Sequence, residues 1–285
     1  MNVQQRRRPL PARINRKAIG WVLLLLLLVL IYTCYHQRAA IRQPESGPGN
    51  PALNALQLPA YKPSDQLIEH NGYTLSFSPQ HQQAAWVAYV LRGYQLQAPH
   101  EDRTDNFMID PLARPHSADD ADYTNSGFDR GHLAAAEDMS WSVQSMKESF
   151  YYTNISPQAP AFNRGVWKRL EELVRYWGEA YDSVYVVTGP VLYNGLPAIG
   201  HDKVSVPQTF YKAVLVYNAA AVQGIGFVLR HEASTATLKT FAVSIDNVEK
   251  LTGLDFFPKL PDDVEEKIES GYNENDWLWT KKKAK

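Results

Sequence analysis

The residues that could do chemistry lie in the middle of the chain. The run Asp129-Arg130-Gly131-His132 places a histidine close to an arginine, and Asn163 follows at the start of a segment with helical periodicity. A neutral imidazole accepts protons well because its pKa lies near neutral pH. An amide oxygen suits a hard cation such as Mg²⁺, and an arginine stabilises developing negative charge. Together these side chains could hydrolyse an anionic ester such as a phosphodiester.

Hydrolysis of a phosphodiester needs a base for the attacking water and a cation for the charge that develops. We expect the adjacent Arg130 to disfavour the imidazolium and to keep His132 neutral. Mg²⁺ often keeps several waters, so one oxygen from Asn163 together with a substrate phosphate would suffice to hold it. This predicts Lewis-acid assistance by a single Mg²⁺, for which Mn²⁺ could substitute, rather than a two-metal pair.

A helix is predicted over Gly165–Tyr181, where apolar residues recur at helical spacing. Glu171 lies eight residues after Asn163, and Arg175 lies four residues after Glu171. At about 100° per residue, all three could share one broad polar face. Glu171 could then orient a water on the metal, and Arg175 could bind phosphate. The alternative is an ordinary surface pair between Glu171 and Arg175.

The remaining pattern predicts an α+β fold. Alternating or β-branched runs predict strands, and these are Tyr73–Phe77, Gln83–Tyr94, Ser183–Thr188, Phe210–Tyr217 and Gly224–Leu229. The polar stretch from His100 to Asn125 is expected to be a loop, and Asp262–Ser270 a short helix. We predict that the globular domain covers residues 66–275 and that residues 276–285 form a basic tail.

The N-terminal part of the sequence predicts a membrane anchor. Residues 1–17 are basic, residues 18–36 are almost wholly apolar, and residues 37–65 are rich in proline and glycine. The apolar run is about long enough to cross a bilayer as a helix, and the positive-inside rule places the basic segment in the cytoplasm. This predicts a single-pass protein of the inner or cell membrane, whose domain lies on the periplasmic or extracytoplasmic side after an extended linker. A cleaved signal peptide is the alternative.

The charge distribution limits how a nucleic acid could bind. Six of the 29 basic residues lie within the first 17 positions, which leaves 23 basic against 30 acidic residues and a net charge of −7. Proteins that coat nucleic acids through a broad surface are usually basic. Any capture of phosphate should therefore depend on a few local side chains. The only cysteine, Cys34, excludes an intramolecular disulfide and a cysteine-rich zinc site.

Several ordered segments resemble the sugar non-specific DNA/RNA endonuclease family, which includes endonuclease G. The first is Asp122–Leu133, which contains the Asp-Arg-Gly-His run, and the second is Thr153–Trp167. Val187–Pro190 and the run from Val206 to Lys212 are also similar, so the resemblance covers about residues 67–260. It implies a ββα-metal nuclease fold with a central, mainly antiparallel sheet flanked by helices.

The resemblance also implies roles for matching residues. His132 would be the general base, and Asn163 would be the only direct protein ligand of Mg²⁺. Arg130 would contact phosphate or stabilise the transition state. Glu171 would hold a water on the metal, and Arg175 would act near the leaving group.

Two further residues are assigned to substrate binding by the resemblance. Arg103 precedes Asp110-Pro111 and matches an arginine that the family has before an Asp-Pro pair. Asn154 would help to shape the metal site. The implied activity is Mg²⁺-dependent cleavage of DNA and RNA to 5′-phosphate products. A non-catalytic nucleic-acid receptor, for example in DNA uptake, and a tethered interaction module remain as alternatives, and a homodimer stays open.

Overall fold

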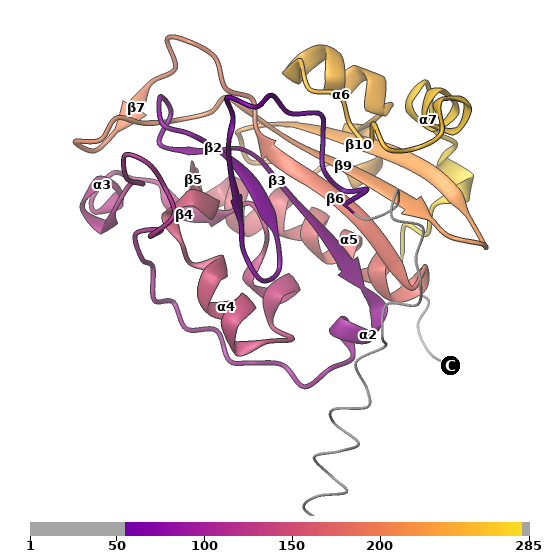
Figure 1. Cartoon of the computed structure of the whole chain (residues 1–285), viewed down its shortest axis with the longest axis horizontal. Coiled ribbons are helices and arrows are strands. Elements are labelled where there is room, and N and C mark those ends of the chain that lie inside the picture. Colours follow the sequence, from indigo (N-terminus) through magenta and orange to yellow (C-terminus); the bar gives the residue numbers. More distant parts are fainter. Residues whose placement is uncertain (1–54, 281–285) are drawn as a thin grey trace, which may run out of the picture. The chain divides into compact units, whose positions relative to one another are not determined.

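A seven-stranded antiparallel sheet forms the centre of the part of the chain that the computed structural model describes, residues 55–280 (Figure 1). Every pair of neighbouring strands is antiparallel. In spatial order the strands are β1 (Gln66–Glu69), β2 (Thr74–Ser78), β3 (Gln83–Arg92), β6 (Ser183–Pro190), β9 (Thr209–Tyr217), β10 (Val222–Arg230) and β11 (Ala242–Val243). The predicted mainly antiparallel sheet is confirmed.

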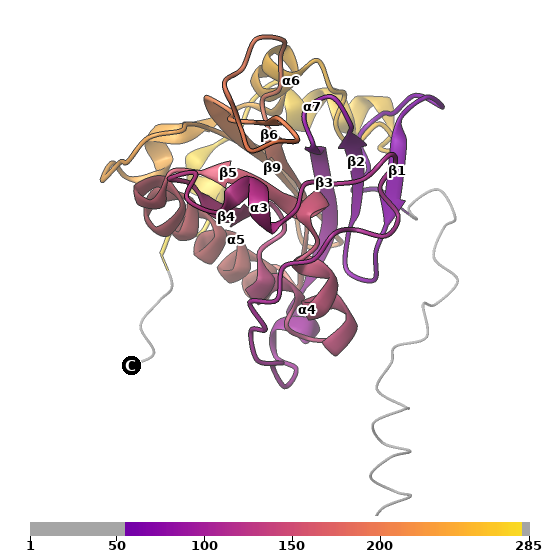
Figure 2. The same ribbon diagram turned by 90° about the vertical axis from the view of Figure 1, so that its left-hand side faces the viewer.

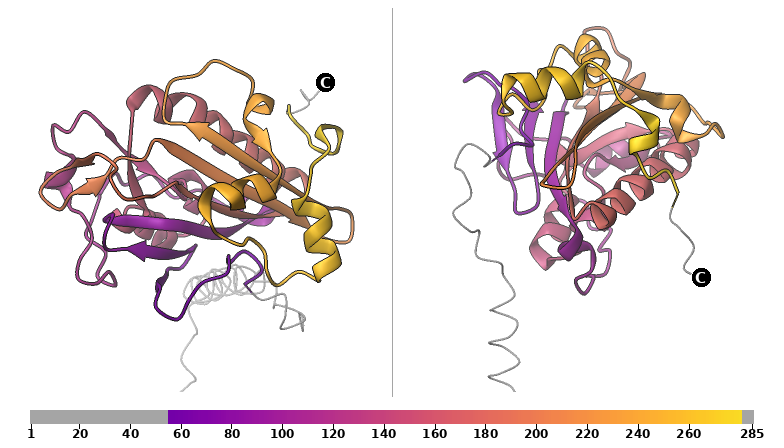
Figure 3. Two further views of the ribbon diagram at one scale, coloured as in Figure 1. Left: turned by 90° about the horizontal axis from the view of Figure 1, so that it is seen from above. Right: turned by 90° about the vertical axis from the view of Figure 1, so that its right-hand side faces the viewer.

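Helices cover both faces of this sheet (Figure 3). Successive residues of a strand point to opposite faces, and in β6 Val186 belongs to one core cluster while Val187 belongs to the other. Helix α5 (Lys168–Ala180) packs its apolar side on the first face. Helices α6 (Ile245–Thr252) and α7 (Asp262–Glu269) pack on the second. The predicted α+β class is therefore confirmed.

A β-β-α unit carries the predicted chemistry. Strand β4 (Asp129–His132) pairs with β5 (Ile155–Gln158) so that Asp129 lies opposite Gln158 and His132 opposite Ile155. A π-helical segment, Phe162–Trp167, follows β5 and leads directly into α5. Figure 2 shows the two short strands beside that helix. This β-β-α order is the one that the family resemblance implied, although neither short strand was predicted from the residue pattern.

Most predicted elements are present, but their ends differ. The strand predicted over Gln83–Tyr94 ends at Arg92, and its last two residues begin a one-turn helix, α2 (Gly93–Leu96). The helix predicted from Gly165 begins as a regular α-helix only at Lys168, because Gly165 has non-helical backbone angles. Elements that the sequence did not predict include α3 (Asp120–Tyr123), α4 (Val143–Ser149), α6 and the small hairpin of β7 (Ala198–Ile199) and β8 (Val204–Ser205).

Both predicted boundaries of the domain were drawn too narrowly. Leu56 is fully buried in the core and the amide of Ala60 donates to the carbonyl of Asp255, although residues 37–65 were predicted to be a linker. Trp277, assigned to the tail, is also buried, and its ring lies 4.3 Å from that of Trp177 on α5. Burial of large apolar side chains contributes favourably to folding, so both segments are part of the domain.

The predicted membrane anchor at residues 18–36 lies outside the described residues, as does the basic segment before it. Within residues 55–280, no helix combines the length and the apolar character needed to cross a bilayer.

Candidate functional site

His132 lies at the end of β4 and is almost completely buried. The edge of its ring meets Phe150, with 4.9 Å between ring centres, and Phe107 lies on another side at 5.7 Å. Its Nε2 has no hydrogen-bond partner among the described residues. Burial, with a smaller contribution from the charge of Arg103, lowers the pKa of His132 to about 3. The imidazole is therefore neutral at physiological pH and holds a free lone pair that can accept a proton.

The arginine that acts on His132 is Arg103, not the adjacent Arg130 as predicted. The guanidinium of Arg103 lies 5.2 Å from the centre of the Phe150 ring, which also meets His132. Its other partners are exposed carboxylates, Asp105 at 2.6 Å and Glu137 at 3.9 Å. This half-exposed cation is close enough to oppose protonation of His132 and open enough to meet a phosphate.

Arg130 is instead held by its own network. Its Nε donates to the hydroxyl of Tyr152 at 3.1 Å, and its Nη2 donates to the carboxylate of Asp120 at 2.5 Å. The guanidinium also lies 5.6 Å from the ring centre of Phe107. Asp120 therefore neutralises Arg130, and contact with a substrate phosphate would require this ion pair to open.

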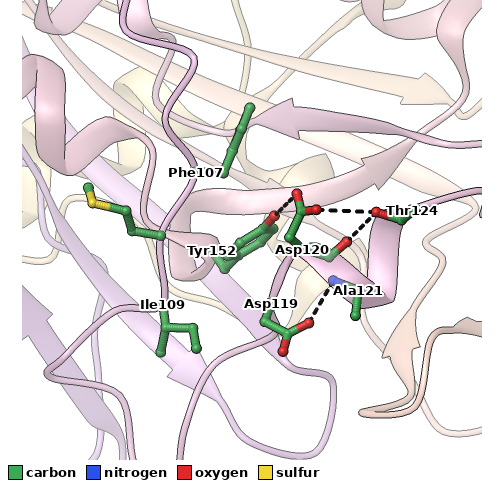
Figure 4. A pocket seen from close by; sticks show the side chains of 8 residues that line it. Phe107, Ile109, Asp119, Asp120, Ala121, Thr124 and Tyr152 are labelled. Atoms are coloured by element: carbon green, nitrogen blue, oxygen red, sulfur yellow. Dashed lines mark hydrogen bonds between the residues drawn. The ribbon is translucent and has the colours of Figure 1, made fainter.

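A pocket of about 800 Å³ adjoins this network (Figure 4). Its lining residues are Phe107, Met108, Ile109, Asp119, Asp120, Ala121, Thr124 and Tyr152. Figure 4 shows the hydroxyl of Tyr152 directed at the Asp120 carboxylate, a contact of 3.1 Å. Because Phe107 contacts both this pocket and His132, the pocket lies next to the candidate base. Its lining is apolar and acidic, so it does not offer a phosphate site.

A second pocket, of about 350 Å³, brings together two of the predicted arginines. Arg103 and Arg175 both line it, together with three acidic residues, Glu101, Glu137 and Glu179. The two arginines come from a loop and from α5, 72 positions apart in the sequence. Their convergence makes this pocket the best candidate among the described residues for binding a phosphate near His132.

Asn163 offers the oxygen that a hard metal ion requires. Its Nδ2 donates to Oδ2 of Asp129 at 3.0 Å, and Arg164 donates to both oxygens of the same carboxylate. Burial works against the charged form of Asp129, but the hydrogen bonds from Arg164 and Asn163 hold its pKa below the usual value. A charged carboxylate only accepts hydrogen bonds, so the amide must turn its nitrogen to Asp129. The Asn163 oxygen is thereby left for another partner, and this fits Mg²⁺.

The polar side of α5 does not carry the surface pair that was the alternative reading. Arg175 forms its ion pair with Asp138 at 2.7 Å rather than with Glu171. Asp138 is buried and also accepts a hydrogen bond from the hydroxyl of Tyr89. Burial raises the pKa of Glu171, and the charge of Asp138 raises it further, while Lys212 and Arg175 oppose the shift. Arg175, Asp138, Glu171 and Lys212 therefore form one electrostatic cluster, and Arg175 connects it to the second pocket.

Lys212 is the member of this cluster whose chemistry the sequence did not indicate. It lies on β9, is fully buried, and its Nζ has no hydrogen-bond partner among residues 55–280. The ammonium lies 4.9 Å from the centre of the Trp167 ring. Burial lowers its pKa, and the charge of Glu171 opposes this. A lysine inside the apolar run Phe210–Tyr217 was the available signal, since lysine is almost never fully buried without a partner.

Asn154 cannot contact the substrate directly, as the predicted substrate-binding role required. It is fully buried, its Nδ2 donates to the carbonyls of Ala134 and Ser149, and its Oδ1 accepts from the amide of Ala134. These bonds join the segment after His132 to the end of α4. Asn154 is thus a positioning residue for the β4–β5 unit.

The comparisons with known proteins agree with this geometry. Residues 54–263 match the model of the DNA/RNA non-specific endonuclease family. Human mitochondrial endonuclease G is 35% identical over 210 residues, which cover 68% of this chain and 70% of the relative. A nuclease of Nostoc is 31% identical over 73% of this chain and 79% of its own length.

The fold is shared as well. A crystal structure of the EndoG/EndoGI complex matches with a TM-score of 0.67 and 28% identity, over 75% of this chain and 95% of the matched chain. The family match covers the β-β-α unit and the sheet behind it. The chain therefore belongs to the DNA/RNA non-specific endonuclease family and is a nuclease similar to endonuclease G.

Proposed function

We propose that this nuclease hydrolyses phosphodiester bonds of both DNA and RNA with little sequence preference, requires Mg²⁺ and leaves 5′-phosphate ends. The observation that carries the proposal is a neutral, buried His132 with an unpaired Nε2, held on the same strand as the carboxylate that orients Asn163. The two residues supply the base and the metal ligand from one β-β-α unit. The names of the relatives, which are nucleases, support the same reaction class.

Each of the side chains at the site has a separate role in the proposed reaction. Nε2 of His132 accepts a proton from water as the water oxygen bonds to phosphorus in line with the departing oxygen. The bond between phosphorus and the 3′-oxygen breaks, and this oxygen takes a proton from solvent. Asn163 would hold Mg²⁺, which supplies Lewis-acid stabilisation of the developing charge when it is bound. Arg175 stabilises the departing oxygen, and Arg103 binds the neighbouring phosphate.

The charge balance supports low sequence preference. The residues that face the second pocket recognise phosphate, which is the same at every nucleotide, and backbone contacts carry no direct sequence information. The net charge of −7 outside the N-terminal segment, from 23 basic and 30 acidic residues, argues against a broad basic surface for this task. The arginine pair should therefore provide most of the affinity for the nucleic-acid backbone.

The location of the enzyme rests on the sequence alone. The basic segment, the apolar run of residues 18–36 and the proline-rich stretch support a single-pass anchor with a cytoplasmic N-terminus. The nuclease domain would then act on the periplasmic or extracytoplasmic side. Protease added to that side of sealed cells should digest the domain, whereas protection of the domain would reverse the proposed orientation.

The activity is tested with the purified chain, plasmid DNA and single-stranded RNA, with Mg²⁺ or with EDTA. His132→Ala should lower cleavage of both substrates by about 100- to 10,000-fold, the usual contribution of a general base. His116→Ala, which changes an exposed histidine, is the matched control. Folded His132→Ala protein that cuts at the wild-type rate would refute the mechanism, and wild-type protein that binds both substrates without cutting would favour a receptor.

A further inference from the structure

Helices α6 and α7 approach the sheet unusually closely at two glycines of β10. A Cβ atom at Gly224 would lie 3.0 Å from the carbonyl oxygen of Ile268, and one at Gly226 would lie 3.1 Å from the carbonyl oxygen of Ser244. These carbonyls belong to the end of α7 and to the residue before α6. The glycines therefore allow the C-terminus of α7 and the start of α6 to meet on one face of the sheet, as Figure 3 illustrates.

Three carboxylates converge where these helices meet. Asp246 and Glu249 lie on α6, Glu269 is the last residue of α7, and one oxygen from each lies within 4.8 Å of the other two. Glu269 is only 7% exposed, and its Oε1 has neither a hydrogen-bond partner nor accessible surface. Within residues 55–280, none of the three forms an ion pair with a lysine, arginine or histidine. Glu269 thus has a buried oxygen without a hydrogen-bond partner and lies in a cluster with two other carboxylates.

This arrangement is costly for a carboxylate without a ligand. Burial raises the pKa of Glu269 to about 9, and the charges of Glu249, Glu265, Asp255 and Asp246 add to the effect. The C-terminal end of a helix also carries partial negative charge, which disfavours an anion at Glu269. A group in such surroundings is stable only if it takes up a proton or binds a cation.

We propose that Asp246, Glu249 and Glu269 form a divalent-cation site that joins the end of α7 to α6, separate from the nuclease centre. The donors are all carboxylate oxygens, which favours a hard cation over zinc or copper. Ca²⁺ fits best because it accepts several carboxylates in irregular geometry. One oxygen of Glu249 already accepts from the amide of Phe256 at 2.8 Å, and its other oxygen remains for the ion. Asp246 and Glu249 are half-buried, so water can complete the coordination.

A second group of possible ligands, Asp119, Asp122 and His201, lacks this property. Asp122 is buried, but its oxygens accept hydrogen bonds from the backbone amides of Asp119 and Asp202. Its carboxylate is therefore satisfied by the protein and joins α3 to the β7–β8 loop. The unpartnered oxygen of Glu269 distinguishes the α6–α7 cluster from this structural group.

The proposal is tested by calorimetric titration of CaCl₂ into the purified full chain after treatment with EGTA, and by thermal unfolding in the same buffers. Asn163→Ala is included so that binding at the nuclease centre can be subtracted. In wild-type and Asn163→Ala protein, Ca²⁺ at about 100 times its Kd should raise the Tm by roughly 5 to 10 °C. Glu266→Gln, which changes an exposed residue of the same helix, should respond in the same way.

Glu269→Gln and Asp246→Asn should each lose this heat of binding and the rise in Tm. Because Asp246 is half-buried, its variant is expected to fold even if Glu269→Gln does not. Two results together would overturn the proposal: Asn163→Ala protein gives no heat of Ca²⁺ binding, and the Glu269→Gln variant has a higher Tm than the wild type in the absence of Ca²⁺. That outcome would show that Glu269 carries a proton instead. Failure of nuclease activity would leave the result of this titration unaffected.

Discussion

The carboxylate of Asp129 accepts a hydrogen bond from Nδ2 of Asn163 at 3.0 Å, across 34 positions of sequence. Asp129 begins the same strand that ends at His132. The first residue of the Asp-Arg-Gly-His run is thus bonded to the residue that would hold the metal, while the last residue is the base. This relationship explains why the run and Asn163 act as one unit.

Asp129→Ala should weaken the response to Mg²⁺. Without the carboxylate, the amide of Asn163 can rotate and present nitrogen where oxygen is needed, and loss of such an orienting partner typically costs 10- to 100-fold in metal affinity. Plasmid cleavage measured over a series of Mg²⁺ concentrations should show half-maximal activity at a concentration higher by about that factor. Arg164→Ala removes the other partner of Asp129 and should change this concentration much less. Equal effects of the two variants would contradict the orienting role.

The low pKa of His132 predicts a dependence of stability on pH. The unfolded chain binds a proton at His132 below about pH 6.5, whereas the folded chain does so only near pH 3. The unfolded state binds more protons between these values, so folding stability falls as pH is lowered through this window. Between pH 6.5 and pH 5, His132 should account for a loss of about 2 kcal/mol in the free energy of unfolding.

Urea unfolding of wild-type and His132→Gln protein at both pH values measures this contribution. The variant cannot take up the proton, so its stability should fall by about 2 kcal/mol less than that of the wild type. His116→Gln provides the control because His116 is exposed. Identical pH dependence in all three proteins would show that His132 is not held neutral by burial.

Substitutions of Arg103 and of Arg175 should differ in their effects on the free energy of unfolding. Arg175→Ala leaves the buried Asp138 without its ion pair, so unfolding should become easier by about 3 to 5 kcal/mol. Arg103 pairs only with exposed carboxylates, and Arg103→Ala should change stability by less than about 1 kcal/mol. Nuclease activity should nevertheless fall in both variants. Urea unfolding together with cleavage kinetics checks this, and full activity of Arg103→Ala would remove it from the phosphate site.

Lys212→Met should change the pH profile of cleavage more than the fold. Methionine fills a similar volume and removes a buried ammonium that has no hydrogen-bond partner, so the fold should be retained. Glu171 then loses the positive charge that opposes the rise of its pKa, and it becomes charged only at higher pH. The acidic limb of the activity profile should therefore move to higher pH. Lys168→Met, which changes an exposed residue of α5, should leave the limb in place.

The parts of the site that could be predicted from the sequence are those set by local pattern. The histidine in its four-residue run and Asn163 before an amphipathic helix are both visible over short distances, and so are the longer strands. The partners of the charged residues could not be predicted in this way. Arg175 pairs with Asp138 and Lys212 lies near Glu171 because the sheet and α5 pack together, and neither contact has a signal in local spacing.

The same limit explains the two corrected boundaries. Proline and glycine near Leu56 indicate an extended chain but not whether that chain lies on a core. The lysine-rich end next to Trp277 suggests solvent, although the tryptophan itself is buried. An extended segment can belong to a domain because one large side chain is buried in the core. Composition averaged over a window of residues does not reveal such a single side chain.

The packing of Trp277 and Trp279 against Trp177 also has a consequence for the order of events during synthesis. Trp177 lies on α5, two residues after Arg175, and its indole nitrogen donates to the carbonyl of Leu278 at 2.7 Å. Helix α5, which carries Glu171 and Arg175 of the charged cluster, is therefore packed against residues that are synthesised about a hundred positions later. When the Asp-Arg-Gly-His run has left the ribosome, α5 still lacks these contacts. We therefore expect the nuclease to complete its folding only after residue 279 has emerged.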